Sequence, residues 1–159
     1  MAEINLIKES DFALLKECRL FKNLSADTLK IFCADALTVR YNIGEYIFKE
    51  KDISDSMYVI LDGEIKISSI AHDKEVIFAN LKKGDFFGEI AMLTKQMRLT
   101  DAISEKPAYL LMLTNENFEG IKSKHPDILA DVYKEMLIIV CHRLKITDQK
   151  ILIKTIFRG

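Results

Sequence analysis

Proline and glycine are scarce in this sequence: they account for 2 and 6 of its 159 residues, whereas hydrophobic residues make up 49% and charged residues 30%. Disordered chains have the opposite balance, because they are rich in turn-forming and polar residues and bury too little apolar surface to fold. The length is that of one ordinary domain. We therefore predict a single folded domain over residues 1–159.

Cysteine is also rare, and its three positions, Cys18, Cys33 and Cys141, are far apart in the chain. An odd and scattered set excludes a disulfide framework and a closely spaced set of metal ligands. Free cysteine is usually a small buried residue. We expect three reduced thiols in the core of a cytoplasmic protein.

Long apolar runs are missing as well. The longest, Met136 to Cys141, is far shorter than the roughly 20 residues that a membrane-spanning helix needs. The N-terminal stretch MAEINLIKESDF carries acidic residues early and lacks the apolar core of a signal peptide. A net charge of −1 with interspersed signs provides no broad basic surface for nucleic acid or an anionic membrane. These features predict a cytoplasmic protein that binds neither.

The spacing of the apolar residues predicts helices first and strands next. From Ser10 to Ala36 it is three or four, which indicates two amphipathic helices with a break at residues 21–24 and Ser25 as the second N-cap. Over about 37–114 the period changes to two, with no long helix between the strands. Asp62-Gly63 is typical of a two-residue hairpin turn. This order predicts an α+β fold built on an antiparallel β-roll or jelly roll.

A long C-terminal helix is expected over about 126–156, because Pro126 suits the first position of a helix. It carries apolar stripes on nearly opposite faces, at Leu137, Val140, Leu144, Thr147 and Ile151 and at Val132, Ile139, Ile146 and Ile153. A helix that is apolar on both faces has to be covered on both. One face fits against the β-roll. A second copy of the helix is the simplest cover for the other, which predicts a homodimer, and enclosure within one subunit is the alternative.

The stretch FFGEIAMLTKQMRLTDA interrupts the strands with one short helical turn. Gly88 lets the backbone approach a ligand closely. The N–H groups of Ile90 and Ala91 begin the turn and suit an anion, and the Arg98 guanidinium matches two phosphate oxygens. Glu89 repels phosphate, so its oxygens are expected to accept a hydrogen bond from a hydroxyl. The pattern indicates a pocket for a phosphorylated ribose, although Glu89 and Arg98 also fit an ordinary surface ion pair.

These residues resemble the ligand motif of the cyclic-nucleotide-binding domains in catabolite activators, protein kinase A regulatory subunits and cyclic-nucleotide-gated channels. The family motif, Phe-Gly-Glu-aliphatic-Ala followed by Arg, is similar to FGEIA and Arg98. The likeness covers nearly the whole chain. Its further segments are Leu20–Leu24, Gly44-Glu45, Met57–Ile60, Gly63-Glu64, Lys83–Phe86, His125–Leu129 and Arg143–Thr147.

The resemblance implies a non-catalytic sensor of a 3′,5′-cyclic nucleotide, cyclic AMP or cyclic GMP, without a metal. It implies that Glu89 binds the ribose 2′-hydroxyl, that Arg98 binds the cyclic phosphate, that Ala91 donates a backbone N–H, and that the long helix closes over the base. Thr147 stands where the family has an adenine-contacting threonine. The predicted ligand-binding residues are Gly88, Glu89, Ile90, Ala91, Arg98, Leu99, Thr100 and Thr147.

Leu99 and Thr100 depart from the family pattern, in which a small residue and then Ala follow the arginine. A leucine beside the phosphate is expected to narrow the pocket. It also lacks the hydroxyl that resembles a cyclic GMP determinant of the channels, which favours cyclic AMP. The departure keeps open a second interpretation, a ligand-free interaction or dimerisation scaffold with a degenerate pocket.

Two other classes are disfavoured. A metal-dependent β-barrel enzyme needs clustered histidines, and only His72 lies near a strand. The catabolite activators continue into a DNA-binding helix-turn-helix, whereas this sequence ends soon after Thr147. We expect no DNA-binding domain, and output through a separate effector protein or through the dimer.

Overall fold

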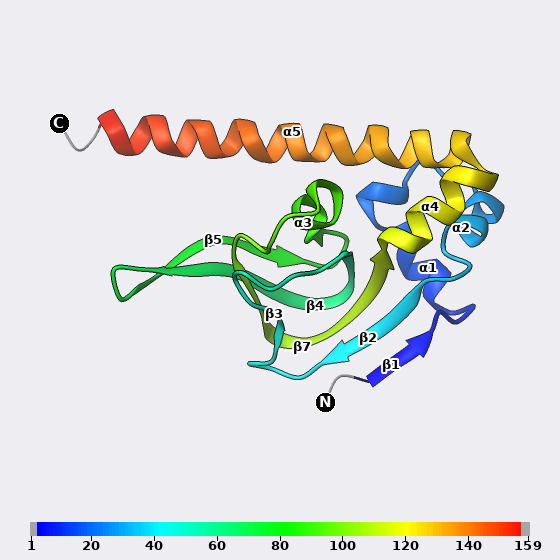
Figure 1. Ribbon diagram of the computed structural model, residues 1–159, viewed down its shortest axis with the longest axis horizontal. Helices are drawn as coiled ribbons and strands as arrows, with labels where there is room; N and C mark the ends of the chain where they lie inside the picture. Colours follow the sequence, from blue (N-terminus) through cyan, green and yellow to red (C-terminus); the bar gives the residue numbers. More distant parts are fainter. Residues whose placement is uncertain (1–2, 157–159) are drawn as a thin grey trace.

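The computed structural model describes residues 3–156 (Figure 1). Its elements in chain order are β1 (Glu3–Leu6), α1 (Asp11–Lys16), the 3₁₀ helix η1 (Arg19–Phe21), α2 (Ala26–Phe32), β2 (Leu37–Tyr41), β3 (Tyr46–Phe48), β4 (Ser56–Ala71), β5 (Lys74–Lys82), β6 (Phe86–Phe87), α3 (Glu89–Thr94), β7 (Asp101–Thr114), α4 (Asn115–Lys124) and α5 (Pro126–Ile156).

The strands form one antiparallel sheet in the order β1-β2-β7-β4-β5, while β3 pairs with β7 and β6 pairs with β4. The sheet curls into a roll, with α1, α2 and α4 at one end and α5 lying across the top (Figure 1). The α+β fold with N-terminal helices, a β-roll and a long C-terminal helix is therefore confirmed. The edge strand β1, which pairs with β2, is an addition to what the apolar pattern predicted.

Local sequence signals account for several element boundaries. The Ser25 hydroxyl accepts a hydrogen bond from the Thr28 N–H at 3.1 Å, which confirms the predicted N-cap of α2. η1 ends at Phe21, the first residue of the predicted break, and α2 begins at Ala26. Thr114 and Asn117 form a capping box at the start of α4, and α5 begins at Pro126 as expected.

The predicted hairpin turn at Asp62-Gly63 is wrong, because β4 runs through these residues as one strand of 16 residues. The pairing register with β7 shifts around Asp62 and Glu64. Gly63 has a φ of +97°, and a Cβ on it would lie 2.5 Å from the Pro107 carbonyl oxygen. The glycine therefore serves a bulge where two strand backbones approach closely. The turn that joins β4 to β5 lies instead at His72 and Asp73, which both have positive φ.

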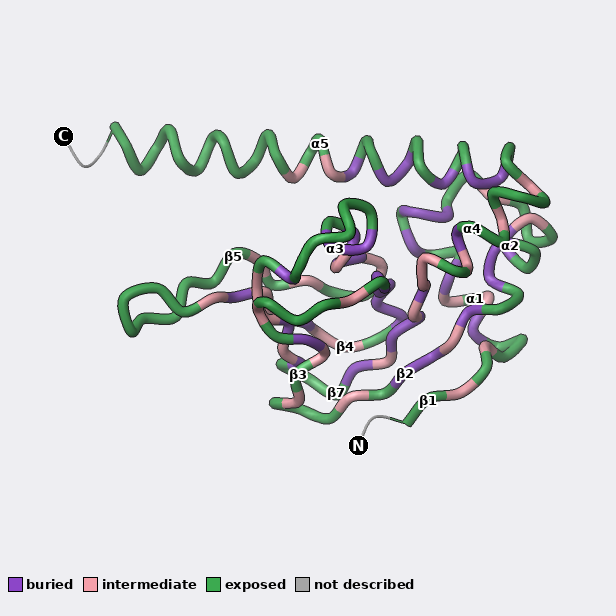
Figure 2. Tube along the Cα trace, viewed as in Figure 1, coloured by how far each residue is buried: buried purple, intermediate pink, exposed green. Residues whose placement is uncertain are grey.

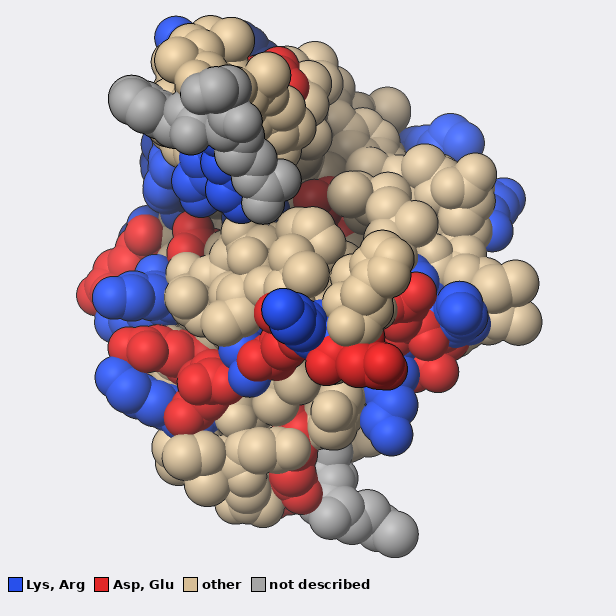
Figure 3. All heavy atoms as spheres, turned by 90° about the vertical axis from the view of Figure 1, so that its left-hand side faces the viewer, with Lys and Arg blue, Asp and Glu red and all other residues tan. Residues whose placement is uncertain are grey.

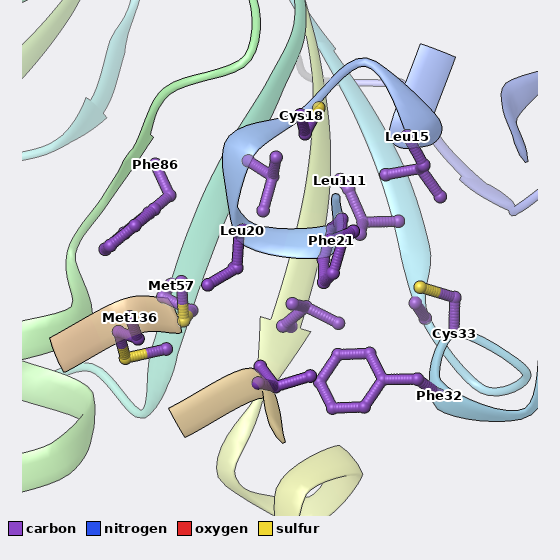
Figure 4. Packing of buried hydrophobic residues seen from close by; sticks show 14 of the residues in the cluster. Leu15, Cys18, Leu20, Phe21, Phe32, Cys33, Met57, Phe86, Leu111 and Met136 are labelled. Atoms are coloured by element: carbon purple, nitrogen blue, oxygen red, sulfur yellow. The ribbon is translucent and has the colours of Figure 1, made fainter. Parts of the chain in front are cut away.

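The main core lies between the sheet and the helical end of the molecule, where Leu15, Phe21, Met57 and Met136 meet (Figure 4). Cys18 and Cys33 belong to this core, as expected, and burial raises the pKa of the Cys18 thiol to about 11. Cys141 is exposed on α5, so the expectation that all three thiols are buried is wrong for this residue. It lies two residues after Ile139, the last buried residue of α5, on an exposed face of the helix.

α5 is buried only along its first half (Figure 2). Val132 and Ile139 pack in the main core, where the helix contacts η1, α2 and α4 and shares the core with residues of the sheet such as Met57 and Leu111. The buried Glu135 carboxylate accepts a hydrogen bond from the Asn23 side chain at 2.5 Å and lies 3.2 Å from the Lys22 ammonium. The second half extends past these contacts over the β-roll. No helix within residues 3–156 combines the length and apolarity needed to cross a membrane.

Candidate ligand-binding site

A cavity of about 390 Å³ lies between the β-roll, α3 and the second half of α5. All eight residues predicted to bind a ligand line it: Gly88, Glu89, Ile90, Ala91, Arg98, Leu99, Thr100 and Thr147. Figure 3 views the molecule from the C-terminal end of α5 and shows basic side chains gathered on the underside of the helix, above the hollow. The structure thus brings the 88–100 stretch and α5, which are distant in sequence, to one site.

Gly88 connects β6 to α3 in the left-handed conformation, with a φ of +82°. A Cβ at this position would lie 2.8 Å from Nη1 of Arg98 and 3.3 Å from the Ser56 carbonyl oxygen. Glycine is therefore required both for the backbone conformation and for the close approach of the arginine. It is also the N-cap residue of α3, which begins at Glu89 with N–H groups that have no partner within the helix.

The Arg98 side chain is buried, with 3% of its surface exposed. Its Nη1 donates to the Gly88 carbonyl at 2.7 Å, and its Nη2 donates to the Ser56 carbonyl at 2.6 Å and to the Ser54 hydroxyl at 2.5 Å. The guanidinium also lies 4.0 Å from the centre of the Phe48 ring. Its Nε is buried and has no hydrogen-bond partner among the described residues. An anionic oxygen would satisfy this donor.

Glu89 is buried on the same cavity wall, with 7% of its surface exposed. Burial raises the pKa of its carboxyl group, while its own backbone N–H, Arg143 and Arg98 act in the opposite direction. Its Oε1 lies 3.8 Å from Nη1 of Arg143. The Glu89 carboxyl group thus lies in the cavity wall beside α5, and its role as the acceptor for a hydroxyl stays a prediction.

Arg143 is a lining residue that the sequence analysis did not select. It donates to the Phe86 carbonyl at 2.7 Å and lies 4.5 Å from the centre of that ring. Ile146, Thr147 and Lys150 line the cavity from the same helix. Spacing of three and four residues places these positions on one face of a helix. Once Thr147 was chosen, this periodicity was enough to find its neighbours.

The remaining wall is apolar and comes from strands β3, β4, β5 and β6. Its side chains are Phe48, Ile67, Phe78, Leu81 and Phe87. A flat apolar group, such as a nucleobase, fits a wall of this kind. The cavity thus combines a buried cation, a buried carboxylate and an apolar surface.

Among the lining residues, Leu99 and Thr147 are exposed and Thr100 is half-buried. Leu99 was expected to narrow the pocket, but 61% of its surface is exposed. The Thr147 hydroxyl donates to the Arg143 carbonyl at 3.0 Å, one turn earlier in α5. Within residues 3–156 there is no cluster of three or more histidine, cysteine or acidic residues that could hold a metal ion.

Comparison with known proteins identifies the family. Residues 38–125, more than half of the chain, match the family model of the cyclic nucleotide-binding domain. The chain therefore belongs to the cyclic nucleotide-binding domain family, whose fold is a regulatory one.

The chain is 30% identical over 134 residues to a cGMP-dependent protein kinase of Drosophila melanogaster, with 80% of this chain and 14% of the kinase covered. It is 32% identical over 123 residues to the type II regulatory subunit of cAMP-dependent protein kinase from the same organism, with 74% and 33% covered. It thus spans at most a third of these relatives. A solved cyclic nucleotide-binding domain from Methylobacillus flagellatus has the same fold, with a TM-score of 0.86, 18% identity, and 95% and 89% of the two chains covered.

Proposed function

We propose that this protein is a non-catalytic sensor that binds a 3′,5′-cyclic nucleotide in the β-roll cavity and signals through α5 to a separate partner protein. The single observation that carries the proposal is that the buried Arg98, the buried Glu89 and four residues of α5 share one cavity. A ligand that contacts Arg98 and Glu89 therefore also meets the helix that would transmit the signal.

In the proposed complex, Arg98 binds the cyclic phosphate and Glu89 accepts a hydrogen bond from the ribose 2′-hydroxyl. The base lies against the apolar wall, close to Thr147. Arg143 links the two ends of this site, because it contacts Glu89 and the Phe86 carbonyl while belonging to α5. The ligand shifts α5 towards the arrangement that buries it better.

We propose cyclic AMP as the preferred ligand over cyclic GMP. The reason is Leu99, which follows Arg98 and has no hydroxyl to hydrogen-bond a guanine. The relatives include a cGMP-dependent kinase and a subunit of a cAMP-dependent kinase, so they support either base.

Isothermal titration calorimetry with cyclic AMP and cyclic GMP tests the proposal, on protein that has been checked for co-purified nucleotide. We expect saturable binding of both, with tighter binding of cyclic AMP. The absence of heat with either ligand at millimolar concentration would show that the chain is not a cyclic nucleotide sensor.

We also propose that the protein forms a homodimer through α5 and acts in the cytoplasm. The dimer is supported by Leu137, Leu144 and Ile151, which lie on one stripe of α5 with about 60% of each residue exposed. A second copy of the helix would cover this stripe.

A ligand-free interaction scaffold is the second candidate function. It is favoured by one observation: both terminal nitrogens of Arg98 already donate to protein oxygens, so the guanidinium is held without a ligand. The same titrations separate the two candidates, because a scaffold would form its dimer through α5 and bind neither nucleotide.

A further inference from the structure

We infer that Ser54 and Ser56 are positioning residues of the phosphate site, whose hydroxyl groups hold the Arg98 guanidinium in the wall of the cavity. The inference rests on the proposed function, because it concerns the same site. It assigns a role to two side chains that neither line the cavity nor belong to the 88–100 stretch.

The two serines lie behind Arg98 and form a connected set of hydroxyl groups. Nη2 of Arg98 donates to Oγ of Ser54 at 2.5 Å, and it lies 3.4 Å from Oγ of Ser56. The two Oγ atoms are 3.0 Å apart, and Ser56 donates in turn to the Tyr58 hydroxyl at 3.3 Å. Both serine hydroxyls thus contact the Nη2 end of the guanidinium, while its Nε has no partner among the described residues.

The acceptors that surround Arg98 are uncharged. Its hydrogen bonds go to two hydroxyls and to the Gly88 and Ser56 carbonyls, and no carboxylate lies within 4.0 Å of it among the described residues. Buried arginines are normally paired with an acid, because an unpaired buried charge is costly. Hydroxyl and carbonyl acceptors orient the guanidinium but do not neutralise it. The carboxylates of Asp52, Glu89 and Asp55 act on its charge from beyond ion-pair distance, so a direct ion pair with a phosphate remains open to it.

The same segment also holds the backbone of Arg98. The Lys51 N–H donates to the Arg98 carbonyl at 2.8 Å, and the Arg98 N–H donates to the Asp52 carbonyl at 2.9 Å. Residues 51–56 thus fix both ends of the arginine before a ligand arrives. Such preorganisation improves affinity, because binding no longer has to order a side chain with many rotamers.

Calorimetric titration of the full chain with cyclic AMP tests the role of Ser54. We expect Ser54→Ala to weaken binding by about threefold to tenfold, because one charge-assisted hydrogen bond that orients Arg98 is lost. Ser54→Thr keeps the hydroxyl and should bind like the wild type. Ser104→Ala is the control: it also removes one serine hydroxyl, but this buried hydroxyl donates to the Lys106 carbonyl and does not contact Arg98. It should leave the affinity unchanged. Equal affinities of Ser54→Ala and the wild type would overturn the inference.

A ligand-free measurement separates this inference from the proposed function. The ¹⁵N-NMR signal of the Arg98 Nε–H, assigned by its loss in Arg98→Lys, should exchange slowly with solvent in the wild type and in Ser54→Thr. In Ser54→Ala we expect exchange to be faster by about threefold or more, since the guanidinium is less well held. If the wild type binds no cyclic nucleotide, the proposed function fails and this signal still decides the inference. Unchanged exchange in Ser54→Ala would contradict the inference alone.

Discussion

Arg98 and Glu89 carry opposite charges into the same cavity, and each is held by different means. Arg98 is oriented by neutral oxygens and an aromatic ring, and it forms no direct ion pair among the described residues. Glu89 is held in a buried position, where desolvation penalises its charged form. These two environments make the phosphate contact and the ribose contact separately testable.

Replacing Arg98 by alanine should weaken cyclic AMP binding by about tenfold to a hundredfold or more, which corresponds to roughly 1.5–3 kcal/mol for a charge-assisted contact. Calorimetry at fixed salt concentration measures the change. Arg40→Ala is the matched control, because Arg40 stacks on the Tyr109 ring at 4.0 Å and does not line the cavity. If Arg98→Ala binds like the wild type, the phosphate lies elsewhere.

Acidification should weaken cyclic AMP binding through Glu89. The pKa of its carboxyl group is raised above 4.5 in the empty protein, mainly by burial. The ionised carboxylate accepts a hydrogen bond from the ribose hydroxyl at either oxygen, whereas the protonated form is a weaker acceptor. Affinity should therefore be constant near neutral pH and fall as the pH drops through this raised pKa. Titrations between pH 7 and 5 measure the profile, with Glu89→Gln as the variant whose profile should be flat.

The same shift affects the stability of the empty protein in the opposite sense. A carboxyl group whose pKa is raised by folding binds its proton more tightly in the folded state, so its contribution to stability is present at low pH and lost as the pH rises through the folded pKa. Ligand binding and folding thus favour different protonation states of Glu89. The free energy of unfolding, measured against pH, tests this. If Glu89→Gln and the wild type show the same pH dependence of stability, another group is responsible.

At the scale of the elements, the course of β4 depends on one glycine. Gly63 allows the strand to bulge against β7, and this bulge lies between the core part of β4, which includes Tyr58 and Ile60, and the part that leads to the cavity wall at Ile67. A bulge increases the local twist of a strand. The second half of β4 can therefore lie with β5 beneath α5.

Gly63→Ala should destabilise the fold by roughly 2–4 kcal/mol, because the new Cβ would meet Pro107 and Ala108 backbone atoms at a positive φ. Gly120→Ala provides the contrast: it lies within α4 and has open space around a Cβ, so we expect it to stabilise by about 0.5–1 kcal/mol. Urea unfolding followed by circular dichroism measures both. Similar midpoints for Gly63→Ala and the wild type would rule out the close contact.

At the scale of the whole molecule, α5 has two halves with different surroundings. The first half is packed on the N-terminal helices and α4 and anchored by Glu135, whereas the second half extends over the cavity and exposes apolar residues. Exposed apolar surface on a helix is a common feature of a docking face. In the proposed sensor, the ligand in the cavity would act on the second half of α5, which also carries this exposed face. The first half, which is packed in the core, would stay in place.

We expect the wild type to be a dimer in light scattering coupled to size-exclusion chromatography at high micromolar concentration. Leu144→Glu should give monomers, because it introduces a charge in the middle of the exposed stripe. Ile53→Glu, which changes a residue with 89% of its surface exposed before β4, should leave the dimer intact. A monomeric wild type, with and without cyclic AMP, would remove α5 as a dimer interface.

Signals confined to a few neighbouring residues predicted structure well. Ser25 caps α2, Pro126 opens α5, and the GEIAML stretch forms a short helix, because each depends on the backbone of its own segment. The Asp62-Gly63 signal failed for the same physical reason. A glycine with positive φ serves a turn and a bulge equally well, and only the presence of β7 beside it decides between them.

Apart from β1 and the turn between β4 and β5, the amino-acid sequence by itself determined the order of helices and strands, and it located the stretch 88–100 that lines the cavity. Hydrophobic period and local backbone preferences act over short distances, which is why they can be read from the sequence. The tertiary structure alone decided which distant groups meet at the cavity. It placed Arg143 beside Glu89, and Ser54 and Ser56 behind Arg98. Such contacts depend on how the roll closes and where α5 is anchored, and no spacing along the chain encodes them.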